Sequence, residues 1–210
     1  MSIPSIVLVG AGGHAAACAD VIEQAGSFAI AGMIGTREQV GTHVAGYAVI
    51  GTDEDLPRLR RTHAHALVTV GQIRTAAPRV RLWEVLTDGG WTVPTVVSPR
   101  AYVSAHSRIA AGTIVMHGAV VNAAADIGRN VIVNSMALVE HDVQVGDHCH
   151  IATAAVLNGG VRVGSRSFVG SATAVRQGVA IGDDCVIGMG QRILSDCAAG
   201  TTLPEAARRT

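Results

Sequence analysis

The histidines and their carboxylate neighbours are the residues of this chain best suited to proton transfer. His141 stands between Glu140 and Asp142, and His150 follows nine residues later. A carboxylate beside an imidazole can hold one ring tautomer and raise its basicity, as a general base requires. We therefore expect His141 to be the catalytic base, fixed by its carboxylate neighbours, and His150 to lie within reach of it around the same edge or across a subunit interface.

A glycine-rich turn near the N-terminus is the second candidate for chemistry. Gly10-Ala-Gly12-Gly13-His14 follows an apolar segment and precedes a predicted helix. Backbone amides of such a turn and the helix N-terminus can approach a phosphate. No acidic residue follows the second predicted strand, where Gly35-Thr36 stands, so we expect no NAD site. A nucleotide or nucleotide-sugar site and a plain glycine turn both stay open.

A repeat of six residues organises the C-terminal half. Every sixth residue from Val97 to Ile193 is aliphatic, over seventeen consecutive positions. A second set of smaller residues follows four positions later, from Ala101 to Val161. A period of six fits neither a helix nor a simple alternating strand, and indicates short strands joined by tight corners. His117 shares the hexad position of His141 on an adjacent face, and its role stays open.

Three hexads should close one coil of a triangular prism. The seventeen hexads then give between five and six coils, a prism about 27 Å tall at ~4.8 Å per coil. Large aliphatic side chains are expected along the axis and small ones where the wall turns. The content of 49% hydrophobic but only 3% aromatic residues favours such narrow layers over a sandwich or a helical bundle.

The first half of the chain alternates predicted strands with predicted helices, which indicates a small parallel α/β domain. We expect an α/β nucleotide-sugar domain over residues 1–96 and a β-helix over residues 97–210. In the predicted third helix, apolar Val80, Trp83 and Leu86 should share one side. The predicted strands are Ser5–Val9, Phe28–Ile34, Val49–Gly51 and Ala66–Val70, and the predicted helices are Ala15–Gln24, Asp53–Thr62 and Pro78–Thr87.

Charge and hydropathy narrow the class of partner. The formal net charge is zero, which argues against a broad nucleic-acid surface. No uncharged apolar run of 18 residues and no signal-peptide pattern is present, so we expect a cytoplasmic protein without membrane insertion. No cysteine stands beside a plausible base, so a covalent acyl-enzyme is not required.

Three segments together resemble one known family. Gly10–His14, Asn134-Ser-Met-Ala-Leu-Val-Glu-His141-Asp and His148-Cys-His150-Ile are similar to the sialic-acid O-acetyltransferases and nucleotide-linked 4-amino-sugar N-acetyltransferases. The resemblance covers nearly the whole chain. It implies an N-terminal domain that holds a nucleotide sugar and a left-handed parallel β-helix of hexapeptide repeats. It also implies a homotrimer, with acetyl-CoA lying between neighbouring prisms and no metal.

The resemblance also implies roles for individual residues. His141 matches the family's catalytic base, Asp142 its orienting carboxylate, and His150 the histidine that contacts the thioester carbonyl or CoA. The expected substrate-binding residues are Gly12, Gly13, His14 and Gly71. The expected cofactor-binding residues are His150, Gly159, Gly188 and Gly190.

Three departures from the family pattern fall on the nucleotide side. Gly35-Thr36 replaces paired acids, Ala16 replaces a lysine, and Gln-Ile-Arg follows Gly71 in place of a polar run. The expected function is acetyl-CoA-dependent N-acetylation of a nucleotide-linked amino sugar in bacterial surface-glycan biosynthesis. O-acetylation of a sialic-acid-like sugar is the alternative. A γ-type carbonic anhydrase would share the prism, but this sequence lacks the histidine trio that binds zinc in that class. A non-catalytic nucleotide-sugar sensor is a further alternative.

Overall fold

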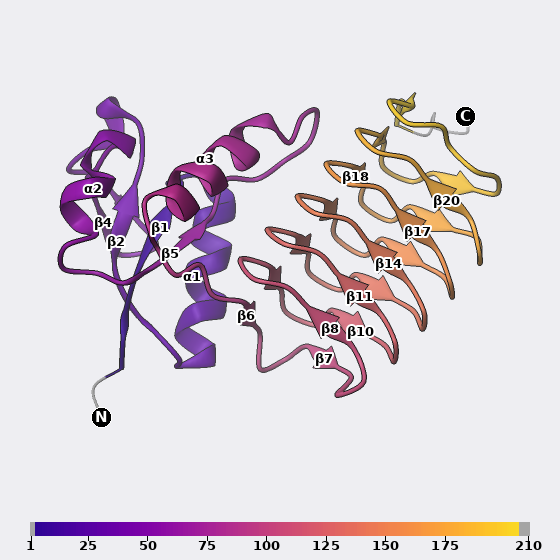
Figure 1. Cartoon of the computed structure of the whole chain (residues 1–210), viewed down its shortest axis with the longest axis horizontal. Coiled ribbons are helices and arrows are strands. Elements are labelled where there is room, and N and C mark those ends of the chain that lie inside the picture. The colour runs from indigo at the N-terminus through magenta and orange to yellow at the C-terminus, as the bar shows by residue number, and fades with distance from the viewer. Residues whose placement is uncertain (1–2, 206–210) are drawn as a thin grey trace. The chain divides into compact units, whose positions relative to one another are not determined.

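The computed structural model of the chain describes residues 3–205, which form two compact units (Figure 1). Within the described residues, the first unit runs to Gly71 and resumes over Ala77–Ser98. The second unit consists of Gln72–Ala76 and the chain from Pro99 onward. No helix in this part of the chain is both long and apolar enough to cross a membrane.

The first unit is built on a five-stranded sheet in the order β3-β4-β2-β1-β5. All its strands run parallel except β3, which pairs antiparallel with β4. Its core is a run of buried strand residues such as Ile6–Val9 and Ala66–Val68. The strands are β1 (Ser5–Val9), β2 (Ala29–Ile34), β3 (His43–Val44), β4 (Tyr47–Gly51) and β5 (His65–Val68), with β6 (Val96–Val97) near the end of the unit.

The helices of this unit depart from expectation in two places. The helix expected over Asp53–Thr62 is only a 3₁₀ turn followed by the one-turn α2, with Pro57 in the first turn of α2, where proline is tolerated. On α3, Leu86 is buried as expected, but Arg79 and Leu82 replace Val80 and Trp83 on the buried side. The helical segments are α1 (Gly13–Ala25), η1 (Arg37–Gln39), η2 (Asp53–Asp55), α2 (Leu56–Leu59) and α3 (Ala77–Asp88).

Arg79 explains the error on α3. Its side chain is fully buried, and its guanidinium Nη1 donates a 2.6 Å hydrogen bond to the carbonyl oxygen of Val70. Residues 79, 82 and 86 have the spacing of one helix face. A charged residue within that face made it look solvent-exposed in the sequence.

The second unit is the predicted left-handed prism of parallel two-residue strands (Figure 1). Strands 18 residues apart pair in register, so each face of the prism is a ladder with one strand per coil. Each aliphatic hexad residue from Val103 to Ile193 is the second residue of its strand. From Val115 onward these side chains are at most 4% exposed, which confirms the predicted axial core.

The three faces take their names here from their first strands. The β7 face contains β7 (Tyr102–Val103), β10 (Val120–Val121), β13 (Leu138–Val139), β16 (Val156–Leu157), β19 (Ala174–Val175) and β22 (Arg192–Ile193). The β8 face contains β8 (Arg108–Ile109), β11 (Asp126–Ile127), β14 (Gln144–Val145), β17 (Arg162–Val163) and β20 (Ala180–Ile181). Within the second unit, the β9 face contains β9 (Ile114–Val115), β12 (Ile132–Val133), β15 (His150–Ile151), β18 (Phe168–Val169), β21 (Val186–Ile187) and β23 (Thr202–Leu203).

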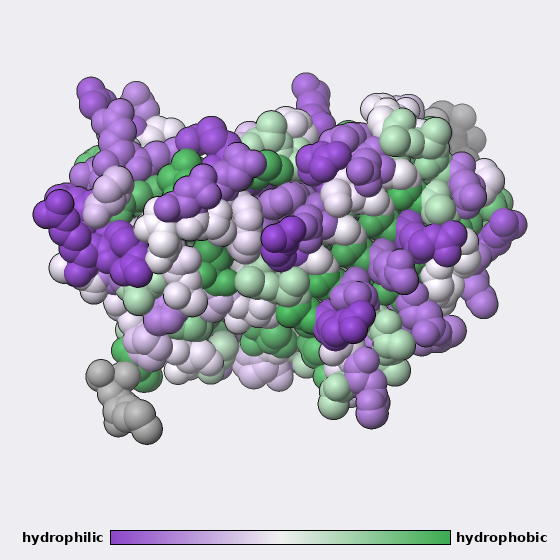
Figure 2. Space-filling view, viewed as in Figure 1, coloured by the Kyte–Doolittle hydropathy of each residue, from purple (hydrophilic) through white to green (hydrophobic). Residues whose placement is uncertain are grey.

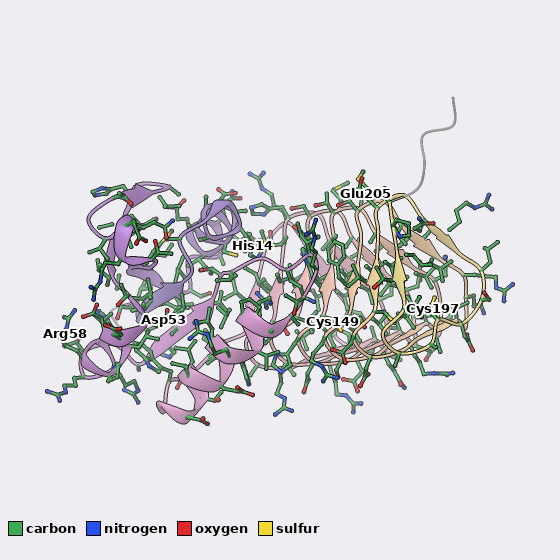
Figure 3. The ribbon with its side chains drawn as sticks, turned by 90° about the horizontal axis from the view of Figure 1, so that it is seen from above. His14, Asp53, Arg58, Cys149, Cys197 and Glu205 are labelled. Carbon is green, nitrogen blue, oxygen red and sulfur yellow. The ribbon has the colours of Figure 1, made fainter. Side chains whose placement is uncertain are left out.

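The coils stack side chains of one kind into columns that run along the prism. Figure 2 shows the result as a hydrophobic band along this unit, bordered by hydrophilic side chains. Inside the prism the small residues of the second set, such as Ala119, Ala137 and Cys149, are fully buried. Figure 3 shows Cys149 among the coils. Any position in one coil therefore has a neighbour of predictable number directly above and below it.

Candidate active site

His141 lies at the corner between the β7 face and the β8 face, after β13 and before β14. Its ring Nδ1 is 2.8 Å from Asp142 Oδ2. Because a carboxylate accepts the hydrogen bond, Nδ1 carries the proton and Nε2 has its lone pair available. Asp142 adopts the left-handed conformation at this corner, with φ +61°, which an acidic residue tolerates better than most.

The carboxylate environment tunes His141 as a base. The hydrogen bond to Asp142 raises the pKa of the imidazole above its ordinary value, with smaller contributions from the charges of Asp142 and Glu140. The His141 side chain is 59% exposed, so a substrate can reach it. An accessible, proton-accepting Nε2 beside a carboxylate is the arrangement that general base catalysis needs.

Glu140 supports the corner rather than the ring. Its Oε2 accepts hydrogen bonds from Asn122 Nδ2 at 3.0 Å and from the backbone N–H of His141 at 3.3 Å. Asn122 stands directly below Glu140, one coil away. Of the two acids beside His141, Asp142 therefore holds the imidazole and Glu140 holds the backbone.

Gly159 stands directly above His141 in the next coil, where the lack of a side chain leaves room for the ring. A Cβ at this position would lie 2.7 Å from both Cε1 and Nε2 of His141. Next to it, a Cβ on Gly160 or Gly178 would meet no atom within 4 Å. The corner above His141 Nε2 is thus backbone without side chains.

His150 lies in a different environment, on β15 of the β9 face. Its side chain is 7% exposed and packs edge-on against Phe168, with ring centroids 5.3 Å apart. Nδ1 lies 2.7 Å from the carbonyl oxygen of Gln72, which can only accept. Nδ1 therefore carries the proton in His150 as well.

The second nitrogen of His150 faces Asn134. Nε2 lies 3.0 Å from Asn134 Nδ2, and Asn134 Oδ1 accepts the N–H of Ser135 at 2.8 Å. The Ser135 bond orients the Asn134 amide so that its NH₂ group points at His150. Nε2 is then a hydrogen-bond acceptor, so it has no proton to donate to a thioester carbonyl.

Gln72 ties the short segment Gln72–Ala76 to the same face. Its side-chain Nε2 donates to the backbone carbonyl of Arg166 at 3.2 Å. The Gln72 side chain is buried, and its main-chain carbonyl holds His150. His141 and His150 thus sit in two separate hydrogen-bonded clusters.

The expected nucleotide loop of the first unit begins at a glycine that the fold itself requires. Gly10 has φ +129°, and a Cβ there would lie 2.8 Å from backbone atoms of Thr69 and Val70. The fold does not require glycine at positions 12 and 13 in this way, because a Cβ at either position would meet nothing within 4 Å. Gly12 is the N-cap of α1 and has no side chain with which to cap the helix. A ligand that approached the backbone closely here would account for glycine at both positions.

His14 lies beside the end of the β5 segment. A Cβ on Gly71 would lie 3.6 Å from His14 Cβ, so these two expected substrate-binding residues are neighbours. His14 Nε2 is also 3.4 Å from the buried Cys18 Sγ. Burial raises the pKa of that thiol to about 12, so Cys18 remains protonated and is no nucleophile.

A cavity of about 510 Å³ opens at the carboxyl ends of the parallel strands in this unit. In open α/β sheets, nucleotides bind in the crevice at this edge. Of the glycine motif, Gly10 and Ala11 line the cavity, and Gly12, Gly13 and His14 do not. The other lining residues are Ile34, Gly35, Thr36, Arg37, Gln39, Thr52, Asp53, Glu54, Val70, Pro78, Arg81 and Leu82.

Gly188 and Gly190 belong to the last complete coils of the prism. A Cβ on Gly188 would lie 2.5 Å from the backbone N of Glu205, so close packing of the next coil already requires glycine there. Gly188 and Met189 also line a cavity of about 690 Å³ with Ile73, Phe168 and other residues of this unit. Its apolar wall and the nearby Arg74 suit a long, partly apolar chain that ends in phosphate.

Several residues around the two histidines were not predicted from the sequence to take part in the site. Asn122, Asn134 and Gln72 reach their partners only through the 18-residue coil or across 78 residues of chain. The register of the hexads could have placed Asn122 below Glu140. Nothing in the local sequence points to Gln72. Among the described residues, no group of three or more His, Cys, Asp or Glu side chains is placed to bind a metal ion.

Two family models match the chain in the regions of the two units. The model of the PglD N-terminal domain matches residues 5–80, and that of the hexapeptide repeat of succinyl-transferase matches residues 160–194. No curated protein matches the sequence.

Solved structures match over nearly the whole chain. Perosamine N-acetyltransferase from Caulobacter crescentus, solved as a histidine-to-asparagine variant with CoA and GDP-perosamine, is 32% identical. The match covers 96% of this chain and 93% of that one, with a TM-score of 0.90. The acetyltransferase domain of PglB from Neisseria gonorrhoeae, solved with acetyl coenzyme A, is 30% identical over 96% of each chain, with a TM-score of 0.88. WeeI from Acinetobacter baumannii, at 19% identity and a TM-score of 0.77, shares the fold. With this identity over nearly the full length of both chains, the protein belongs to the nucleotide-sugar acetyltransferase family.

Proposed function

We propose that the protein transfers the acetyl group of acetyl-CoA to the amino group of a nucleotide-linked sugar. The observation that carries the proposal is the corner at His141, where Asp142 holds Nδ1 and leaves Nε2 exposed as a base. Two relatives that are at least 30% identical are acetyltransferases solved with CoA or acetyl-CoA. One of them holds GDP-perosamine, a nucleotide-linked sugar.

His141 acts as the general base of the transfer. Its Nε2 takes a proton from the acceptor amine while that nitrogen forms a bond to the acetyl carbonyl carbon. Asp142 stabilises the imidazolium that results. The carbon–sulfur bond then breaks, and His141 can return its proton to the departing thiolate. Acetyl-CoA supplies the activated thioester.

We assign His150 a positioning role. Since its Nε2 accepts from Asn134, a backbone N–H is the better donor for the negative charge that develops on the carbonyl oxygen. His150 instead fixes the amide of Asn134 and is itself fixed by the Gln72 carbonyl. This positioning role replaces the contact with the thioester carbonyl or CoA that the resemblance implies for His150.

The acetyl-CoA arm is proposed to run along the bare corner above His141. Gly159 provides backbone without a side chain next to the catalytic nitrogen. Gly188 and Gly190 lie at a different corner, between the β9 face and the β7 face, and are proposed to contact the arm from a neighbouring subunit, where the cavity at Met189 has an apolar wall. Contacts with a pantetheine chain need only exposed backbone and apolar surface.

The acceptor is proposed to bind in the first unit through its nucleotide. Gly12 and Gly13 leave the amides at the start of α1 open to the diphosphate, with His14 and Gly71 beside them. The cavity at the ends of β1, β2 and β4 then takes the rest of the nucleotide.

We further propose a homotrimer assembled through the β7 face. The outward residues of that face include Val120, Leu138 and Val156, a half-buried aliphatic column. The corresponding column of the β8 face holds Arg108, which pairs with Asp126 at 2.8 Å. An apolar column suits a subunit interface better than an ion-paired one. Light scattering should give three times the chain mass, and a monomer at micromolar concentration would contradict the assembly.

The proposed setting is the cytoplasm, where nucleotide sugars for bacterial surface glycans are made. The direct test of function is release of CoA from acetyl-CoA, followed with a thiol-reactive dye, with nucleotide-linked amino sugars and with the matching free sugars. We expect a much higher kcat/KM for the nucleotide-linked sugars. Equal values, or a preference for sialic-acid hydroxyls, would favour the O-acetyltransferase instead.

The Gly13→Trp variant separates acceptor binding from donor binding. A Trp side chain would project into the open space where the diphosphate is proposed to lie. The acceptor KM should rise strongly and the acetyl-CoA KM should stay within about two-fold. Gly41→Trp, at another open glycine of the same unit, is the control, although its φ of +86° calls for a check of folding. An unchanged acceptor KM in Gly13→Trp would place the nucleotide elsewhere.

A further inference from the structure

We propose that Asp53 and Arg81 read the base of the nucleotide and select guanine over uracil. The proposal rests on the proposed function, since it assumes that the cavity of the first unit holds the nucleotide. It starts from a departure in the sequence, where Gly35-Thr36 stands in place of the paired acids that often follow β2 in this family.

The structure shows why an acid does not fit at position 35. A Cβ on Gly35 would lie 2.7 Å from Gln39 Oε1 and 3.1 Å from both Ala11 Cβ and Val49 Cγ1. The Gln39 side chain bridges the ends of two strands there: Oε1 accepts from the Thr36 N–H at 2.9 Å, and Nε2 donates to the Ala11 carbonyl at 3.1 Å. This bridge occupies the space that a side chain at position 35 would need.

The carboxylates of the cavity come instead from the next strand of the sheet. Asp53 follows β4 and begins η2, whose capping box at Thr52 fixes the turn. Asp53 Oδ2 accepts from Arg81 Nη2 of α3 at 2.7 Å. Both residues line the cavity, and their side chains are 38% and 59% exposed. The pair is therefore held in place and still open to a ligand (Figure 3 labels Asp53).

An adjacent carboxylate and guanidinium match one edge of guanine. Guanine presents its O6 acceptor next to the N1–H and N2–H₂ donors, so a carboxylate can accept two parallel hydrogen bonds while an arginine donates to O6. Uracil has a single N–H between two carbonyl oxygens. A carboxylate placed on that N–H meets a carbonyl lone pair, so uracil loses one hydrogen bond and gains a repulsion.

The neighbouring pair of Glu54 and Arg37 serves as an internal control. It lines the same cavity, but its charged groups are 3.9 Å apart and its side chains are 85% and 86% exposed. A pair so exposed has no fixed geometry with which to read a base edge. Glu54→Gln therefore removes one charge from the cavity without touching the proposed reader.

The test measures binding of GDP and UDP to the full-length protein by titration calorimetry. We expect GDP to bind at least about 10-fold more tightly, within the range of one bidentate base contact. Asp53→Asn should weaken GDP binding by about 10-fold and leave UDP within about two-fold. Arg81→Gln, which removes the O6 donor, should also lower the GDP preference, and Glu54→Gln should keep it.

Three results would overturn the proposal. They are tighter binding of UDP than of GDP, a GDP-to-UDP ratio unchanged by both Asp53→Asn and Arg81→Gln, or no binding of either nucleotide. Circular dichroism melts of the variants identify a loss of folding, and either variant alone suffices for the comparison. Absence of acetyl transfer to any nucleotide-linked amino sugar, with the GDP preference intact, would instead count against the proposed function.

Discussion

The two histidines of the β-helix, nine residues apart in the sequence, lie in opposite environments. His141 has one fixed nitrogen and one exposed nitrogen, at a corner with bare backbone above it. His150 has both nitrogens engaged and is 7% exposed against Phe168. A residue that must gain and lose a proton needs one free nitrogen. A residue that must hold its neighbours needs none.

Removing His141 is the strongest way to test this contrast. His141→Ala should lower kcat by ~10²–10⁴, the usual share of a general base, with little change in the acetyl-CoA KM. Steady-state kinetics measure both values. His106→Ala, at an exposed histidine two coils away on the same edge, is the matched control. Activity within a few-fold of wild type would show that His141 is not the base.

Removing His150 should affect stability before chemistry. His150→Ala deletes a buried ring and leaves the Gln72 carbonyl and the Asn134 amide without their partner, which should cost about 2–4 kcal/mol of unfolding free energy. Denaturant unfolding measures the loss. If stability is unchanged while kcat falls as far as in His141→Ala, then His150 acts in the chemistry directly.

Asp142→Asn tests the tuning of the exposed histidine. Asparagine tolerates the positive φ at this corner, so the backbone should persist while the charge is lost. The pKa of His141 should fall, because the bond to Asp142 is what chiefly raises it. The rising limb of kcat/KM against pH, where His141 loses its proton, should move to lower pH, and the plateau should drop about 10-fold.

A matched control exists for that variant. Asp184 has φ +56° at another corner and pairs with Arg166, away from His141. Asp184→Asn should leave the pH profile where it is. If the rising limb of kcat/KM against pH does not move in Asp142→Asn, the observed ionisation belongs to a group other than His141.

Gly159→Ala should have the smallest effect of the series. Its Cβ would push the His141 ring aside, because the two would be 2.7 Å apart. Since the ring is exposed and can rotate, we expect kcat to fall only a few-fold to about 10-fold. Ala123→Ser, one coil below His141, is the control. A full loss of activity would show that Gly159 contacts the donor as well as the base.

The sequence predicted the second unit better than the first for a physical reason. In the prism, burial repeats every six residues, so one register assigns each axial residue from Val103 to Ile193. In the first unit each helix is a separate case. The helix expected over Asp53–Thr62 is reduced to the one-turn α2, and on α3 the buried Arg79 and Leu82 replace the expected Val80 and Trp83.

In the candidate site, too, some contacts could be predicted from the sequence and others could not. The bond between His141 and Asp142 could be predicted because the two residues are adjacent at a corner. The partners of His150 could not, since Asn134 and Gln72 lie 16 and 78 residues away and ordinary polar residues occur at many outward positions. The pairing of Asp53 with Arg81 at the cavity could not be predicted either, because the two residues belong to different elements and lie 28 positions apart.

The 18-residue coil also restricts how such a chain can change in length. Inserting one residue within a face would turn every later axial side chain outward, whereas inserting a whole coil keeps all three ladders in register. The prism should therefore grow or shrink through evolution in steps of about 4.8 Å. Other additions are expected only as loops that leave the wall at a corner and return to it. Any relative that places its donor-binding coils farther from the catalytic corner must have moved them by a whole number of steps.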